Sequence, residues 1–166
     1  MQATVVERPL THFVGIGATG SFDDLPELVP EARKALLSRQ YEISAVVNPD
    51  EQLGVTRPQE HESGPDQVTT YIGFQVSAYI NVPPNMIAIE LPAGRYAQFV
   101  WQGSFESEAF QSFYPSMFNW FKEQSLTPSG VNPWIEIYGS DHDWEDRSNP
   151  ANRLTVLMPI GGSALQ

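Results

Sequence analysis

Residues 95–121 of the chain read RYAQFVWQGSFESEAFQSFYPSMFNWF, and this stretch contains a strand, a turn and an amphipathic helix in succession. Arg95–Trp101 is rich in β-branched and aromatic residues and ends near Gly103, which predicts a strand. Ser104 or Ser107 is a candidate N-cap for the helix that follows. Apolar residues then recur at helical spacing, which predicts a helix face packed in the core, at Phe110, Phe113, Tyr114, Met117, Phe118 and Phe121. Pro115 either kinks this helix or lies in its true first turn.

The segments on either side complete a unit around this helix. Met86–Leu91 precedes it as an apolar strand, with a turn signal at Pro92-Ala93-Gly94. After it, Trp134–Tyr138 is a strand by propensity, Asp141–Ala151 is a polar loop, and Leu154–Met158 is a last strand stopped by Pro159.

The first half of the chain follows the same order. Thr4–Val6 and His12–Ile16 predict strands, and a helix follows with Asp23 or Asp24 as its cap and Pro26 in its first turn. The remaining predictions are a short strand at Gln52–Val55, a loop at His61–Gln67 and a long strand at Val68–Ile80.

The two halves are therefore an internal repeat, and they predict an α+β domain. We expect one domain over residues 1–166, with repeat one at about 1–82 and repeat two at about 83–166. The two strand–helix–strand–strand repeats would be related by a pseudo-twofold axis. They would share one antiparallel sheet, with both helices on one face. The opposite face would then be open, and we expect a ligand cleft there.

Composition excludes several classes of protein. The chain has no cysteine, so it cannot contain a disulfide or a thiolate metal site. Its formal net charge of −11 and its scattered basic residues predict no direct binding to nucleic acid or to anionic membranes. No signal peptide and no apolar run long enough to span a bilayer is visible, so a cytoplasmic location is expected.

Several blocks in order resemble the GyrI-like, or AraC-type effector-binding, domain of bacterial multidrug-binding proteins. They are Tyr71–Val76, Ile89–Ala97 with Gly103, Trp134–Tyr138 and Leu157–Ile160. The resemblance covers essentially the whole chain and implies the repeated fold described above. It also implies binding of amphipathic, often cationic small molecules between the repeats. Many members are fused to a DNA-binding helix-turn-helix, but this chain has no room for one and looks like a standalone member. Asn152-Arg153 departs from the acidic character expected there.

Glu136 is the principal candidate for the binding site. Strand alternation places Trp134, Glu136 and Tyr138 on one face, where aromatic rings and a carboxylate would suit a cation. The resemblance implies the same, because the family's binding-site glutamate matches this position.

Further aromatic residues are candidates for lining the cleft. Phe99 and Trp101 fall on one face of their strand and Tyr96 on the other, while Tyr71 and Phe74 also lie on opposite faces. The sequence does not decide which face of each strand is core and which lines the cleft.

Metal, cofactor and catalytic motifs are not found. The three histidines lack metal-ligand spacing, and the acidic stretch Asp141–Asp146 is interpreted as a solvated loop. The leading hypothesis is a binding module that acts as a sensor or regulator, without a cofactor. One alternative is a small hydrolase of electrophilic natural products that uses Glu136 as a base. Another is a gyrase-inhibitor-type interaction module that engages a protein partner through Glu60–Asp66 or Asp141–Asp146. The ligand and the oligomeric state stay open.

Overall fold

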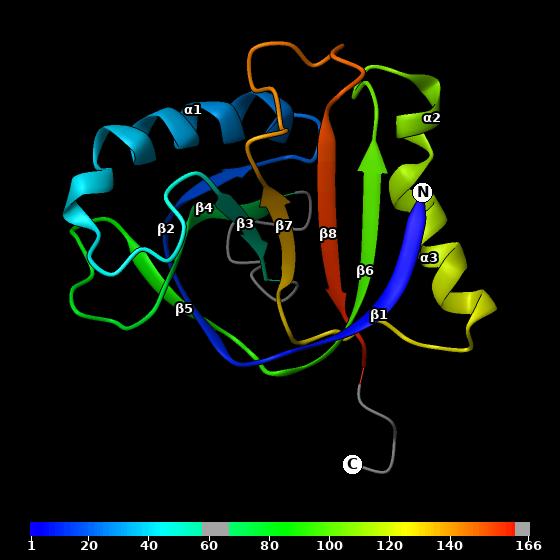
Figure 1. Cartoon of the computed structure of the whole chain (residues 1–166), viewed down its shortest axis with the longest axis horizontal. Coiled ribbons are helices and arrows are strands. Elements are labelled where there is room, and N and C mark those ends of the chain that lie inside the picture. Colours follow the sequence, from blue (N-terminus) through cyan, green and yellow to red (C-terminus); the bar gives the residue numbers. More distant parts are fainter. Residues whose placement is uncertain (58–66, 162–166) are drawn as a thin grey trace.

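The computed structural model describes residues 1–57 and 67–161, and they form one antiparallel sheet of eight strands with its helices (Figure 1). The strand order is β1-β6-β8-β7-β3-β4-β2-β5. The strands are β1 Gln2–Arg8, β2 Thr11–Gly20, β3 Gln52–Thr56, β4 Val68–Val76, β5 Ile87–Leu91, β6 Gly94–Gln102, β7 Trp134–Tyr138 and β8 Arg153–Pro159. The helices are α1 Leu25–Ser38, η1 Gln40–Glu42, α2 Glu108–Gln111 and α3 Phe113–Glu123.

The predicted repeat is visible in the order of elements. Each half consists of two strands, a helix and two strands, and the expected join near residue 82 lies between β4 and β5. The first strand of each half pairs within the other half's group, because β1 pairs with β6 and β5 pairs with β2. The two groups meet where β3 pairs with β7, so the centre of the sheet is also the join between the repeats.

Local sequence signals explain where the second helix begins and why it is divided. The Ser107 hydroxyl accepts the backbone N–H of Phe110 at 3.2 Å and so caps α2. The helix is interrupted at Ser112 and restarts as α3, with Pro115 in the first turn of α3, where a missing N–H costs nothing. In the first half, Asp24 is the N-cap residue of α1, and the predicted long strand ends at Val76 rather than at Ile80.

Both helices cover the same face of the sheet, as predicted. Leu36 of α1 belongs to one core cluster with Phe113, Met117 and Phe121 of α3 and with side chains from one face of the strands. Figure 1 shows α1 over the β2–β4 end of the sheet and α3 over the β6 end, with β7 and β8 between them.

The prediction of an open cleft on the opposite face is wrong. That face carries its own buried core, which includes Phe13, Val55, Tyr96, Ile135 and Leu157 and draws on strands of both halves. The sheet is twisted, and the direction of its strands changes from β2 to β6 (Figure 1). Because of this twist, side chains from several strands meet on the helix-free face and bury one another. The cavity that contains Glu136 lies instead on the helix-bearing face.

Candidate functional site

A cavity of about 730 Å³ lies on the helix-bearing face, between α1 and the α2–α3 pair. Its floor is formed by β3, β4, β7 and β8, and the loop that joins β7 to β8 contributes to its wall. Aromatic and aliphatic side chains dominate the lining: Phe22, Leu25, Pro26, Val29, Pro30, Val68, Phe105, Phe110, Tyr114, Phe118, Trp134, Tyr138, Trp144 and Leu154. The size and the apolar lining are those of a small-molecule site.

Glu136 lies on the floor of this cavity, next to the join between the repeats. The predicted alternation is confirmed, because Trp134, Glu136 and Tyr138 all line the cavity while Ile135 and Ile137 pack on the opposite face. The Tyr114 hydroxyl of α3 donates a hydrogen bond to Glu136 Oε1 at 2.8 Å, and the Tyr138 hydroxyl donates one to Oε2 at 2.5 Å. Each carboxylate oxygen therefore has one phenolic donor.

The two phenols are held in their neutral, donating form. Burial raises the pKa of Tyr114 and of Tyr138 well above the ordinary value, and the negative charge of Glu136 raises each pKa further. Both phenols can therefore donate to the two carboxylate oxygens of Glu136.

A glycine opposite Glu136 leaves room for this arrangement. Gly54 of β3 is the register partner of Glu136 in the β3–β7 pair. A Cβ at Gly54 would lie 2.9 Å from the Tyr138 hydroxyl oxygen, so a larger residue there would displace the phenol. The second repeat therefore contributes the carboxylate of Glu136, and the first repeat contributes Gly54, whose missing side chain leaves room for the Tyr138 phenol.

Several cavity residues lie on α2 and α3, where the sequence predicted only core. Phe113, Met117 and Phe121 are buried against the sheet, but Phe110, Tyr114 and Phe118 form a second row, also with a spacing of four residues, that faces the cavity. Phe118 packs on Trp134 with ring centroids 5.7 Å apart. The sequence did contain a signal for this second row, because the apolar stripe of the helix is wider than packing against the sheet alone requires.

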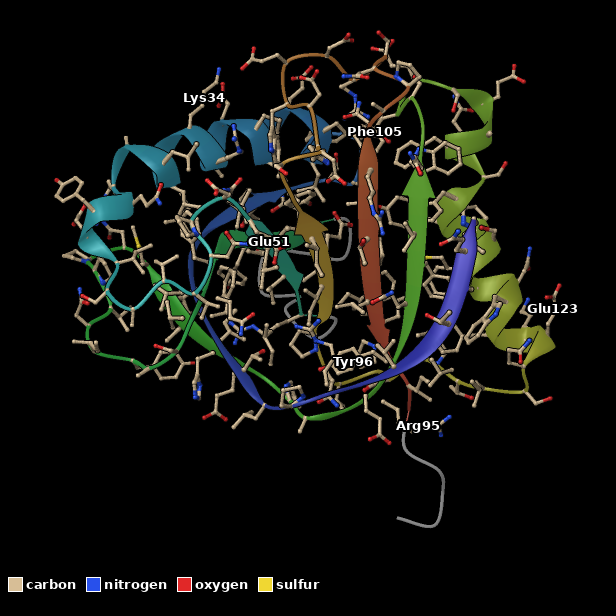
Figure 2. The ribbon with its side chains drawn as sticks, viewed as in Figure 1. Lys34, Glu51, Arg95, Tyr96, Phe105 and Glu123 are labelled. Atoms are coloured by element: carbon tan, nitrogen blue, oxygen red, sulfur yellow. The ribbon has the colours of Figure 1, made fainter. Side chains whose placement is uncertain are left out.

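Five of the predicted site residues lie outside the cavity. Phe74 and Phe99 are fully buried in the core beneath the helices, and Trp101 packs there against Phe110 at 5.3 Å. Tyr71 and Tyr96 pack on the helix-free face. Figure 2 shows Tyr96 near the start of β6, at the end of the sheet away from Phe105. The pairs predicted to lie on opposite faces do so, but none of these five side chains lines the cavity, although Val68 and Thr70 of β4 do.

The loop between β7 and β8 is ordered by hydrogen bonds of its own. Asn152 is fully buried, and its side chain accepts the N–H of Asp143 at 2.6 Å and donates to the carbonyl of Asp146 at 3.0 Å. A carboxylate at this position could accept a hydrogen bond but not donate one, so the amide is suited to both bonds. Among the residues that the structure describes, no cluster of acidic and histidine side chains is suited to a metal ion.

Arg33 fastens this loop to α1. Its guanidinium lies 4.6 Å from the centroid of the Trp144 ring, and its Nε donates to Gln52 at 3.1 Å. Trp144 is thereby held as a wall of the cavity.

His142 lies in the same wall, and we predict that it makes stability depend on pH. It packs against Phe105, Tyr138 and Trp144, and burial lowers its pKa to about 4. In the unfolded chain a histidine takes up a proton below about pH 6.5. The unfolded state therefore binds more protons between pH 6.5 and 4, and the free energy of unfolding falls as the pH falls through that range. After discounting for partial exposure of the ring, we expect a loss of about 1–2 kcal/mol.

Urea unfolding of the wild type and of His142→Phe at pH 7.5, 5.5 and 4.5 measures this effect. Phenylalanine keeps the aromatic packing and cannot be protonated, so the variant should lose less stability than the wild type on acidification. Parallel pH profiles for the two proteins would contradict the assignment.

Comparison with known proteins agrees with this geometry. The model of the GyrI-like small molecule binding domain matches residues 1–160. The transcriptional regulator BrlR of Pseudomonas aeruginosa is 27% identical over 164 residues, which are 96% of this chain and 56% of that protein. The chain thus spans about half the length of this relative.

Solved structures share the fold at low sequence identity. The structure of SAV2435 bound to tetraphenylphosphonium has a TM-score of 0.71 at 15% identity, over 98% of this chain and 95% of that one. A hydrolase encoded by lin2189 from Listeria innocua has a TM-score of 0.60 at 15% identity, over 96% and 92% of the two chains.

The repeated sheet and its cavity between two helices define a small-molecule-binding domain. The chain belongs to the family of GyrI-like small molecule binding domains. No helix within residues 1–57 and 67–161 has the length and apolar character needed to cross a membrane.

Proposed function

We propose that the cavity binds monocationic small molecules with aromatic or amphipathic bodies, and that Glu136 is their counter-charge. The observation that carries the proposal is a carboxylate on the floor of a cavity walled by aromatic rings. Rings attract cations through their negative faces, and a carboxylate away from bulk water is screened less than at the surface. The tetraphenylphosphonium bound to SAV2435, a protein of the same fold, is a cation of this kind.

The position of Glu136, rather than an excess of acidic groups, supports selectivity for cations. Two arginines, Arg57 and Arg147, line the cavity along with Glu136 and Asp143, so the formal charges balance. Arg147 is exposed and lies over the Phe105 ring at 5.7 Å, and Arg57 lies over the Tyr71 ring at 5.2 Å. A cation bound at the floor between Trp134, Tyr114 and Tyr138 would lie close to Glu136 itself.

We further propose that the domain acts in the cytoplasm as a sensor or regulatory module. BrlR, by its name a transcriptional regulator, contains a region similar to this chain, and this supports a role in regulation. Of the alternative protein-interaction surfaces, residues 60–66 lie outside the described residues, and the side chain of Asp143 in the other loop is engaged by Asn149. The hydrolase-named neighbour supports likeness of fold alone, so we propose binding without turnover.

Calorimetric titration of the wild type with tetraphenylphosphonium and with neutral triphenylphosphine oxide tests the proposal. We expect the cation to bind at least about tenfold more tightly, which corresponds to about 1.4 kcal/mol. Mass spectrometry of the recovered ligand should return it unchanged. Equal affinities would contradict a charge-based site, and consumption of a reactive ester or epoxide that depends on Glu136 would favour the hydrolase.

A further inference from the structure

We propose that Tyr114 and Tyr138 make this cavity selective for onium cations without N–H groups, in preference to protonated amines of the same shape. The ligand class is thus quaternary ammonium or phosphonium. This inference rests on the proposed function, because it concerns which cations are accepted at Glu136.

The carboxylate of Glu136 is already hydrogen-bonded before any ligand arrives. Tyr114 approaches from α3 and Tyr138 from β7 itself, and each donates to a different oxygen at 2.8 and 2.5 Å. Tyr138 is buried and Tyr114 is partly buried, so a hydroxyl that turned away from Glu136 would find few other acceptors. Each oxygen of the Glu136 carboxylate therefore already accepts one hydrogen bond, and fewer lone pairs remain for an N–H group of an incoming cation.

Apart from the exposed Gln67 and from His142, the other polar side chains of the lining are already hydrogen-bonded or carry donors only. The hydroxyls of Thr56 and Thr70 are 2.9 Å apart and bond to each other. The Asp143 carboxylate accepts the backbone N–H groups of Glu145 and Asp146 and the amide of Asn149, at 2.9–3.0 Å. Arginine has donors only. Most of the remaining lining is aromatic or aliphatic carbon.

A primary ammonium and a quaternary onium differ in what they lose on entering such a cavity. The ammonium gives up the hydrogen bonds that its three N–H groups donate to water, and it finds too few acceptors in return. The quaternary cation has no N–H donors, and its charge is spread over carbon-bound hydrogens that pack against the rings. Both gain from the charge of Glu136, so the difference lies in the unmade hydrogen bonds.

The test uses two matched ligands, (4-phenylbenzyl)trimethylammonium and (4-phenylbenzyl)ammonium, titrated at pH 7. In the wild type we expect the quaternary cation to bind at least about tenfold more tightly. Tyr114→Phe frees one carboxylate oxygen, so the primary ammonium should gain affinity and the ratio should fall at least about threefold. Tyr138→Phe tests the other oxygen in the same way.

Tyr41→Phe is the control, because it removes a phenolic hydroxyl at an exposed position that does not line the cavity. Its ratio should equal that of the wild type. A wild-type ratio near one, or ratios that do not change in either tyrosine variant, would overturn the inference while leaving the proposed function intact if both cations still depend on Glu136. Binding of both cations that is insensitive to Glu136→Gln, or no binding, would overturn the proposed function as well. If a tyrosine variant does not fold, the wild-type ratio decides.

Discussion

Glu136→Gln should weaken binding of a lipophilic cation such as tetraphenylphosphonium by about thirtyfold or more. Removing one partner of a desolvated charge pair costs on the order of 2–5 kcal/mol, part of it from leaving the other charge unpaired. At about 1.4 kcal/mol per tenfold change in affinity, the lower end of that range gives the thirtyfold loss. Titration of both proteins at one ionic strength measures it.

Two comparisons separate the charge of Glu136 from its shape. Triphenylphosphine oxide should lose far less affinity, because it carries no net charge to be left unpaired. Glu123→Gln removes the same charge at an exposed site at the end of α3 (Figure 2), so it should leave the affinity for the cation within about twofold. Equal affinity of wild type and Glu136→Gln for the cation would remove Glu136 from the binding site.

The same substitution should also have a small effect on stability. A glutamine at 136 keeps one acceptor oxygen, but its amide presents a donor to the second phenol, so either Tyr114 or Tyr138 must reorient. We expect a decrease of about 1 kcal/mol in the free energy of unfolding. The strand alternation that placed Glu136 in the site gives no indication that its carboxylate is already hydrogen-bonded.

Strong local patterns made the strands predictable. β7 spans Trp134–Tyr138 as predicted, because its alternation is bounded by proline and glycine at its ends. The face on which Glu136 lies follows from the same alternation. The strand predicted at Val68–Ile80 was too long, since Tyr79 leaves the sheet to pack on His12 at 4.6 Å. Tertiary packing of this kind is not encoded in propensity.

The location of the cleft could not be derived in this way. The alternation of residues along a strand shows that the two faces of the sheet differ. It does not show which face becomes buried when the sheet twists. Val55 and Ile135 lie on the face that was expected to be open, in the core that the twisted sheet forms on itself. Of the aromatic candidates on β6, Tyr96 lies in that core, whereas Phe99 and Trp101 lie in the core beneath the helices, so none of them lines the cavity.

The helices contributed to the site in a way that only the packing reveals. α1 and α3 lie far enough apart to leave the centre of the sheet uncovered, so one row of each helix faces ligand space rather than core. Val29 and Tyr114 are on such rows. Hydrogen bonding of Tyr114 to Glu136, across 22 positions in sequence, depends on that spacing and has no local signal.

Gly73→Ala should be the most damaging small substitution for the fold. A Cβ at Gly73 of β4 would lie 2.1 Å from the carbonyl oxygen of Val14 and 2.5 Å from the Cα of Gly15, both in the backbone of β2. Gly15 is the register partner of Gly73, so the two strands approach closely where neither residue has a side chain. Backbone atoms cannot rotate away, so β2 or β4 must shift within a packed core.

We expect Gly73→Ala to lower the free energy of unfolding by roughly 3 kcal/mol or more, above the usual range for overpacking. That outweighs the 0.5–1 kcal/mol or so that alanine gains over glycine from its more restricted unfolded chain. Gly130→Ala is the control, because a Cβ there meets no atom within 4 Å, and its stability should stay within about 0.5 kcal/mol of the wild type. Urea unfolding followed by tryptophan fluorescence measures all three proteins. Equal stability of Gly73→Ala and the wild type would mean that β2 and β4 do not approach as closely in solution as this register requires.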